Sequence, residues 1–159
     1  MFDFLKKKKK VEVIAPFPGA VMPISEVPDP VFSQKMVGDG FAVRPEGTVV
    51  ECRAPVDGEL SMIFPTGHAF GIKMENGFEV LVHLGLDTVE LDGKGFEVLL
   101  KQGDTVKQGD IVIKMDTELI KAAGKDTITP VVFTNKDLVK NLTLDCSKGA
   151  KAACEVELN

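Results

Sequence analysis

The side chains able to transfer a proton or another group near neutral pH are few, because the chain has two histidines, His68 and His83, and no Tyr or Trp. A neutral imidazole nitrogen is nucleophilic when the other ring nitrogen donates its proton to a fixed acceptor, such as a backbone carbonyl. Gly67 and Gly85 lie near the two rings in sequence and permit close backbone approach. Thr66 adds a hydroxyl that could bind an anion. We therefore place the candidate chemistry around this pair.

His83 ends a segment with the alternation of a half-buried strand. One face of that strand carries Phe78, Val80, Val82 and Leu84. The other face, which is only partly apolar, carries Glu79, Leu81 and His83. We expect His83 to be more than core filling. Since His68 follows another predicted strand, the two rings could meet across neighbouring strands.

Two other kinds of site fit the sequence less well. The two imidazoles could bind zinc together with Asp87, Glu75 or Glu79. No H-x-x-x-H or H-x-H spacing supports such a site. A serine or cysteine hydrolase is disfavoured more strongly, because the chain has no G-x-S-x-G motif and no cysteine in a recognisable nucleophile context.

The elements that must position the histidines are mostly strands. Fifteen glycines and nine prolines separate short Val- and Ile-rich runs, which predicts an antiparallel β-sandwich or barrel in one domain. One short helix is predicted over 116–124, with Asp116 or Thr117 as its N-cap. The predicted strands cover residues 11–14, 40–43, 48–53, 59–64, 69–73, 78–84, 96–99, 111–114, 129–133 and 142–144.

Two sequence patterns each occur twice. An A-P-x-x-G pattern begins at Ala15 and again at Ala54. A Q-G-D pattern begins at Gln102 and again at Gln108, and it places a Gly-Asp turn before a short strand each time. These echoes suggest related β units that pack together.

The composition excludes some classes of function. The formal net charge is −5, and residues 6–10 are all lysine, which leaves a net charge of about −10 on the remainder. Such an acidic body argues against nucleic-acid binding. The three cysteines, Cys52, Cys146 and Cys154, suggest neither a disulfide framework nor a structural zinc site. With no signal peptide and no stretch long enough to span a bilayer, we expect a cytoplasmic protein.

The first ten residues are expected to form a basic N-terminal tail, and residues 11–159 the domain. Blocks of like charge repel and remain solvated. Weak attraction of the tail to anionic lipid is the alternative, although so small an apolar patch does not anchor a protein by itself.

A series of short motifs follows one another along the chain. They are Ala15-Pro16 with Gly19, Val27-Pro28-Asp29, Val37-Gly38-Asp39-Gly40, Ala54-Pro55-Val56-Asp57-Gly58, His68-Ala69-Phe70, Val82-His83-Leu84-Gly85-Leu86-Asp87-Thr88-Val89-Glu90-Leu91 and Thr127-Ile128-Thr129-Pro130-Val131-Val132. In these motifs and their order, the chain resembles the glucose-type IIA component of the bacterial phosphoenolpyruvate-dependent sugar phosphotransferase system, from Ala15 to about Val139.

The resemblance implies a phosphocarrier with a barrel-sandwich hybrid fold and short helical segments. His83 would accept a phosphoryl group through Nε2 from the phosphohistidine of the carrier HPr, and pass it to a cysteine on the IIB domain of a glucose-type permease. His68 resembles the second family histidine, which supports onward transfer, and Thr66 the threonine that hydrogen-bonds near the pair. The resemblance requires no cofactor, although His68 and His83 could hold a zinc ion adventitiously or share one with a partner. The membrane would be met only through the permease.

The resemblance also implies a shallow apolar docking surface around the histidines, formed here by Val31, Phe32, Met36, Val37, Phe64, Gly71 and Leu81. Acidic residues beside it, Asp29, Asp87 and Glu90, would meet basic residues of the partners. Regulatory target proteins could use the same surface.

Two rival functions remain open from the sequence. Gly-Asp turns ahead of Lys114 are similar to half of a biotinyl or lipoyl carrier domain, in which Lys114 would be the modified residue. Against this, Lys114 lies in a continuous strand-like run rather than at a hairpin tip. A non-enzymatic regulatory binding protein is the other alternative, and it is compatible with phosphoryl transfer.

Overall fold

A computed structural model describes residues 10–147 and 152–159 of the chain. The predicted basic tail therefore lies outside the described residues, apart from Lys10, which begins the first strand.

The largest element is a seven-stranded sheet in which every neighbouring pair is antiparallel. In spatial order its strands are β2 (Gly19–Pro23), β3 (Asp39–Pro45), β11 (Thr129–Phe133), β7 (Glu79–His83), β6 (Ala69–Lys73), β5 (Gly58–Ile63) and β9 (Thr105–Val106). The strand with His83 is thus central, and the strand that follows His68 is its neighbour.

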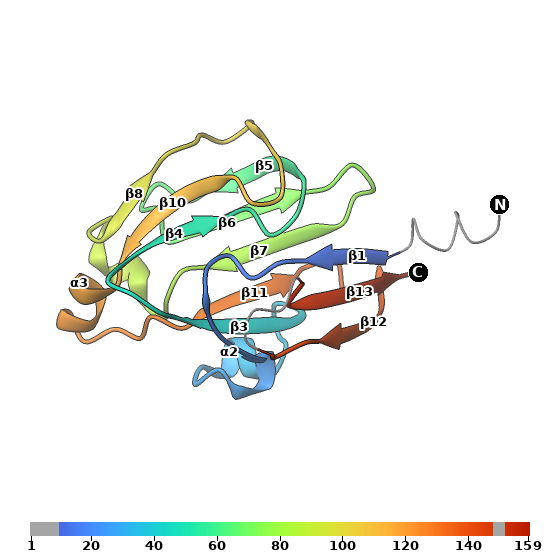
Figure 1. Ribbon diagram of the computed structural model, residues 1–159, viewed down its shortest axis with the longest axis horizontal. Helices are drawn as coiled ribbons and strands as arrows, with labels where there is room; N and C mark the ends of the chain where they lie inside the picture. Colours follow the sequence, from blue (N-terminus) through green and yellow to red (C-terminus); the bar gives the residue numbers. More distant parts are fainter. Residues whose placement is uncertain (1–9, 148–151) are drawn as a thin grey trace.

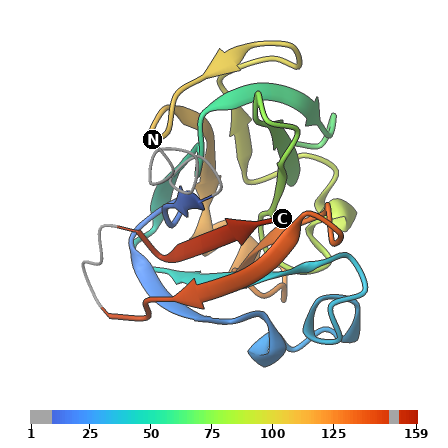
Figure 2. The same cartoon turned by 90° about the vertical axis from the view of Figure 1, so that its right-hand side faces the viewer.

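Two further antiparallel sheets of three strands each complete the sandwich. One contains β4 (Val49–Arg53), β10 (Ile111–Asp116) and β8 (Phe96–Val98), in that order. The other contains β1 (Lys10–Val13), β13 (Cys154–Leu158) and β12 (Val139–Leu144). Figure 1 shows β8 and β10 at one side of the molecule and α2 beside β3 at the other, and Figure 2 shows β12 and β13 lying next to each other.

The helices are short. They are η1 (Ile24–Glu26), α2 (Pro30–Ser33), η2 (Thr88–Leu91) and α3 (Thr117–Ala122). The prediction of a helix near 116–124 is confirmed, and Asp116 caps it by accepting a hydrogen bond from the Leu119 N–H at 3.1 Å. The expectation of a single helix was wrong, because α2 forms a turn whose N-cap is Asp29. Four residues are too few to show a helical period in the sequence.

Along β3 and β11 the large sheet is buried on both faces, and each face belongs to a different hydrophobic cluster. The larger cluster includes Phe41, Val43 and Val131, while Ala42 and Val132, their neighbours along the strands, belong to the smaller one. The smaller cluster also contains Ile24, Val27, Phe32, Leu86 and Ile128. The segment from η1 to α2 therefore covers a second core on the face that carries His83.

The predicted echoes correspond to paired structures. The residue before each A-P-x-x-G segment donates a hydrogen bond to the proline carbonyl of the other segment, from Ile14 N–H to Pro55 O at 3.1 Å and from Arg53 N–H to Pro16 O at 2.8 Å. The two Gly-Asp turns are closed alike: an Asp104 carboxylate oxygen accepts from Lys101 N–H at 3.0 Å, and one of Asp110 accepts from Lys107 N–H at 2.9 Å. Related β units do pack together.

All three cysteines are free, as the sequence predicted. Burial raises the pKa of the Cys154 thiol to about 12 and that of Cys52 further still, so neither is a reactive thiolate. None of the helices in the described part of the chain has the length and hydrophobicity of a transmembrane segment.

Candidate functional site

The two histidines lie against each other at the ends of neighbouring strands. His83 is the last residue of β7 and is paired in register with Ala69, the residue after His68. The Leu84 N–H donates a hydrogen bond to the His68 carbonyl at 2.6 Å, which ties the two strand ends together. The ring centroids of His68 and His83 are 5.2 Å apart with an interplanar angle of 74°. The expected meeting of the rings across strands is therefore observed.

The alternation predicted for the His83 strand is confirmed. The four apolar side chains Phe78, Val80, Val82 and Leu84 are all buried. Glu79, Leu81 and His83 on the other face are half-buried. His83 therefore faces the side covered by α2, where the ring of Phe32 lies 5.2 Å from it.

The tautomer of neutral His83 follows from its hydrogen bond. Its Nδ1 lies 2.7 Å from the carbonyl oxygen of Gly85. A carbonyl oxygen can only accept, so Nδ1 carries the proton and the lone pair of the neutral ring is on Nε2. Gly85 has φ of 79°, a left-handed conformation that brings its carbonyl back to the ring at little cost for glycine.

Burial lowers the pKa of His83 below its ordinary value. Three features oppose that shift, namely the hydrogen bond to Gly85 and the charges of Asp29 and Asp87. The net direction is downward, so the ring is neutral and nucleophilic at neutral pH.

His68 is more deeply placed, with 3% of its surface exposed. Thr66 Oγ1 forms a short hydrogen bond with its Nδ1, and the ring of Phe64 packs edge-on at 4.9 Å. Burial, and then the charge of His83, lower the pKa of His68 to about 4. His68 is therefore a neutral ring beside a neutral ring.

Thr88 is a residue of this site for which no role was predicted from the sequence. It is fully buried, and its hydroxyl donates to the Leu84 carbonyl at 2.6 Å. A Cβ placed on Gly85 would lie 2.6 Å from Cγ2 of Thr88, so the threonine methyl fills the space that glycine leaves open. Thr88 thus holds the turn whose carbonyl orients His83. Thr88 lies inside the motif over residues 82–91, but no sequence pattern predicts a buried hydrogen bond from a threonine hydroxyl to the carbonyl four residues earlier.

The residues expected to form the docking surface lie at different depths. Met36 is 61% exposed and Val31 44% exposed. Val37, Phe64 and Leu81 are half-buried. Val37 and Leu81 pack against the smaller hydrophobic cluster. The docking surface, with its exposed Met36 and Val31, is therefore continuous with a packed core.

Two of the predicted docking residues are buried. Gly71 is buried in β6, where it is paired with Met62 and Leu81. Phe32 is 7% exposed and belongs to the smaller cluster. Both lie next to predicted site residues and can support the surface from below.

The three acidic residues have different surroundings. Asp29 caps α2 by accepting from the Val31 N–H at 2.9 Å. Asp87 is exposed, with φ of 58°. Glu90 forms an ion pair with Lys125 at 2.6 Å, so its charge is already partly compensated. The acids that raise the pKa of His83 are Asp29 and Asp87.

The structure also bears on two alternatives to this site, a zinc site at the histidines and a modified carrier lysine at Lys114. In the described ranges, no three His, Cys, Asp or Glu side chains gather as a metal site. The histidine pair therefore lacks a third ligand from Asp87, Glu75 or Glu79. Lys114 lies in β10, the middle strand of its sheet, paired with Glu51 on one side and Glu97 on the other. That position differs from the exposed hairpin tip expected of a modified carrier lysine.

Comparison with known proteins gives a consistent result. A sequence profile for the phosphoenolpyruvate-dependent sugar phosphotransferase system, EIIA 1, matches residues 11–139. The glucose-specific EIIA component of the PTS system from Staphylococcus epidermidis is 48% identical over 138 residues, or 86% of this chain and 81% of the relative. Its counterpart from Bacillus cereus is 48% identical over 143 residues, or 89% and 85%. The solved structure of glucose permease IIA from Mycoplasma capricolum has a TM-score of 0.82 and 39% identity, covering 92% of this chain and 96% of that one.

Proposed function

This chain belongs to the EIIA 1 family of the phosphoenolpyruvate-dependent sugar phosphotransferase system, and on that premise we propose that His83 is the residue that carries the phosphoryl group. The family membership makes the chain a phosphotransferase component. The donor is the phosphohistidine of HPr, and the acceptor is a cysteine on the IIB domain of a permease. Since the relatives are named glucose-specific, a glucose-type permease is the proposed acceptor protein.

The observation that supports this proposal is the hydrogen bond from His83 Nδ1 to the Gly85 carbonyl. It leaves the Nε2 lone pair free to attack the phosphorus of the donor. In that step the N–P bond to the donor histidine breaks, and the P–Nε2 bond to His83 forms. In the second step the cysteine thiolate attacks the same phosphorus, the P–Nε2 bond breaks, and the lone pair returns to Nε2. Nδ1 keeps its proton throughout, held by the carbonyl of Gly85.

His68 serves the second step in this proposal. A phosphoryl group in flight carries negative charge on its oxygens, so catalysis requires donors aimed at those oxygens. When the Thr66 hydroxyl donates to Nδ1 of His68, the proton of the neutral ring is on Nε2, where it can donate to a phosphoryl oxygen. The low pKa of His68 supports a neutral donor rather than a cation, which would hold the phosphoryl group too strongly for onward transfer.

The partners dock on the apolar surface around Met36 and Val31. Transient interfaces have an apolar centre and a polar rim. Asp29 and Asp87 supply negative charge to that rim and suit partners that bring basic residues. Regulatory proteins could use the same exposed side chains, so a binding role can coexist with transfer. The cytoplasmic location remains a prediction from the sequence, as does a zinc ion held at His68 and His83 or shared with a partner.

The test uses His83→Ala and His68→Gln with phosphoenolpyruvate, enzyme I, HPr and a IIB domain. We expect His83→Ala to lose all labelling by phosphorylated HPr. His68→Gln should still be labelled but fail to pass the group to IIB. Because both variants lose one imidazole from the same cluster, each controls for the other. Persistent labelling of His83→Ala would remove the assignment, and unimpaired delivery by His68→Gln would remove the role of His68.

A further inference from the structure

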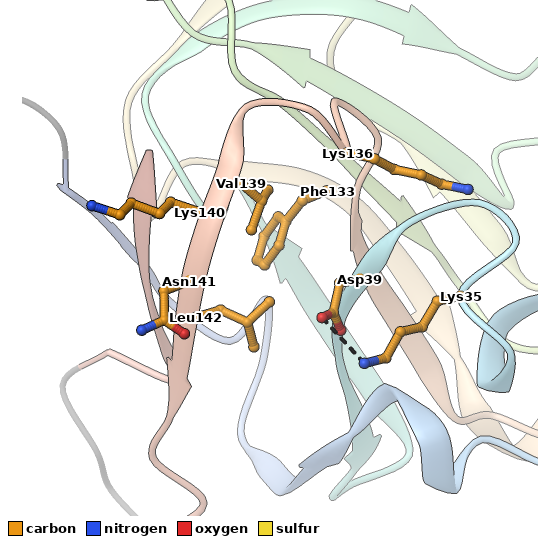
Figure 3. A pocket seen from close by; sticks show the side chains of 8 residues that line it. All are labelled: Lys35, Asp39, Phe133, Lys136, Val139, Lys140, Asn141 and Leu142. Atoms are coloured by element: carbon orange, nitrogen blue, oxygen red, sulfur yellow. Dashed lines mark ion pairs between the residues drawn. The ribbon is translucent and has the colours of Figure 1, made fainter. Parts of the chain in front are cut away.

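A pocket lies away from the histidines, between β12 and the start of β3 (Figure 3). Its volume is about 530 Å³. Its walls come from segments far apart in sequence, including the loop after α2, the end of β11 and the strand β12. This volume is within the range of about 300–1,000 Å³ that is typical of small-molecule sites.

The floor of this pocket is apolar. Figure 3 shows the three apolar side chains that line it: Val139 and Leu142 are half-buried, and Phe133 is fully buried beneath the surface. The ring of Phe133 is held from behind by two other rings, with centroid distances of 6.4 Å to Phe41 and 5.2 Å to Phe78. The floor is therefore fixed by the main hydrophobic core.

A β-bulge in β12 shapes this floor. In a regular strand, Val139 and Leu142 would point to opposite faces, because they are three residues apart. Here the pairing with β13 steps from Val139 opposite Leu158 to Asn141 opposite Glu157, so Lys140 is an extra residue in the strand. The bulge turns both apolar side chains to the pocket. Bulges often occur at sheet edges and beside functional sites, where they redirect side chains.

The rim is basic, although the protein is acidic overall with a net charge of −5. It carries Lys35, Lys136 and Lys140 against a single carboxylate, Asp39. Each ammonium group has an exchangeable surface partner. Lys35 lies 3.3 Å from Asp39, and Lys140 lies 3.6 Å from Glu157. Lys136 donates to the carbonyl oxygen of Met36 at 2.8 Å. Exposed ion pairs contribute little to stability, and the hydrogen bond of Lys136 is exposed as well, so an incoming anion can replace all three contacts.

We propose that this pocket binds a small organic anion, with a carboxylate or phosphate group held by the lysines and an apolar body lying on Val139 and Leu142. The bulge and the lysines disfavour the other occupant of a strand edge, an added peptide strand, because both interrupt regular pairing. The site is separate from the histidine pair and does not depend on the proposed phosphoryl transfer.

Ligand binding in the pocket would change a hydrogen bond at the docking surface. When Lys136 turns to the anion, it gives up its hydrogen bond to the Met36 carbonyl. That carbonyl belongs to the peptide bond between Met36 and Val37, two residues of the docking surface. The Val37 amide is therefore a reporter of ligand binding.

The test is a titration of the full chain with octanoate, followed by amide chemical shifts in NMR spectra. We expect saturable shifts in β12, at Phe133 and at the Val37 amide, with His68 and His83 unaffected. Inorganic phosphate, which lacks the apolar body, and 1-octanol, which lacks the charge, should each bind more weakly. Shifts centred on the histidines, or shifts that never saturate, would overturn the proposal. Equal affinity for 1-octanol would do the same.

A pair of double variants makes the test specific. The variant with Lys136→Gln and Lys140→Gln should bind octanoate about tenfold more weakly, as expected for the loss of charge-assisted hydrogen bonds. The matched control, Lys73→Gln with Lys121→Gln, removes two exposed lysines elsewhere and should bind as the natural chain does. Equal affinities in the two double variants would contradict the site. Self-association of the first variant without octanoate binding by the natural chain would show instead that the lysines only protect a strand edge.

Discussion

Nδ1 of His83 lies 2.7 Å from the carbonyl oxygen of Gly85, two residues further along the chain. The nucleophile is thus oriented by the turn that follows its own strand. Thr88 stabilises this turn, because its hydroxyl donates a hydrogen bond to the Leu84 carbonyl. The reactivity of one ring nitrogen therefore depends on a short chain of local contacts.

Thr88→Val should disturb His83, and Thr88→Ser should not. The valine keeps the methyl that packs on Gly85 but leaves the Leu84 carbonyl without its donor, at a cost of about 1–3 kcal/mol in the free energy of unfolding. With the turn loosened, His83 should populate both neutral tautomers, which the ¹⁵N chemical shifts of its ring report, and accept phosphoryl more slowly. The serine keeps the hydroxyl and should keep the single tautomer. If the valine variant loses stability while the ring shifts are unchanged, Thr88 has only a structural role.

Stability should fall with acid partly because of His68. The pKa of this ring is lowered by burial from 6.5 to about 4 in the folded state. Between those pH values the unfolded chain binds more protons than the folded one, so the free energy of unfolding decreases as the pH falls through that window. Urea unfolding at a series of pH values should show a shallower slope for His68→Gln. The lowered pKa of His83 acts in the same direction and leaves a residual slope. Identical slopes in the variant and the natural chain would contradict the neutral, buried His68.

Met36→Glu should slow phosphoryl transfer without affecting the fold. Met36 is 61% exposed on the docking surface, so its replacement should change the free energy of unfolding by no more than about 0.5 kcal/mol. We expect kcat/KM for phosphorylated HPr to fall about tenfold, because an apolar contact is lost and a charge must be desolvated. The matched control is Val49→Glu in β4, since Val49 is 60% exposed in a sheet that does not contain the histidine strands. An equal loss of activity in both variants would mean that Met36 lies outside the interface.

Asp87→Asn should affect both the ring and the partner. Asp87 raises the pKa of His83, so its neutralisation should lower that pKa further, as measured by NMR titration. The rate of association with HPr should also decrease at low ionic strength and converge with that of the natural chain at high salt. Asp92→Asn is a close control, because Asp92 is exposed with φ of 51° and Asp87 has φ of 58°, a left-handed region that asparagine tolerates. A rate unchanged in the first variant, or lowered equally in both, would exclude specific steering by Asp87.

Much of this site follows from patterns with a physical period. The alternation from Phe78 to Leu84 predicted which side of β7 faces the main core and which side carries His83, and Asp116 marked the start of α3. Those signals are local, so they survive in the sequence. The contact between His68 and His83 could be anticipated, because both lie at the ends of strands. The pairing of β6 with β7, which brings those ends together, is known only from the structure.

Other features could not be predicted, or were missed, for identifiable reasons. β2 runs from Gly19 to Pro23 at a sheet edge, and both residues usually argue against a strand. β13 is absent from the predicted strands, although Cys154, Val156 and Leu158 alternate with glutamates in a pattern typical of a strand. The burial of Gly71 and the ion pair of Glu90 with Lys125 depend on neighbours distant in sequence, and composition carries no record of them.

The reciprocal bonds between the two A-P-x-x-G turns have a consequence for how the molecule folds and comes apart. Ile14 and Arg53 each donate to the opposite turn, so neither turn can complete its own hydrogen bonds without the other. The amide hydrogens of these two residues should then exchange with solvent at one common rate, set by cooperative opening of the whole β body rather than by local fraying. A fragment that ends between the two turns would lack one partner of each reciprocal hydrogen bond. It should recover its structure only when mixed with the rest of the chain.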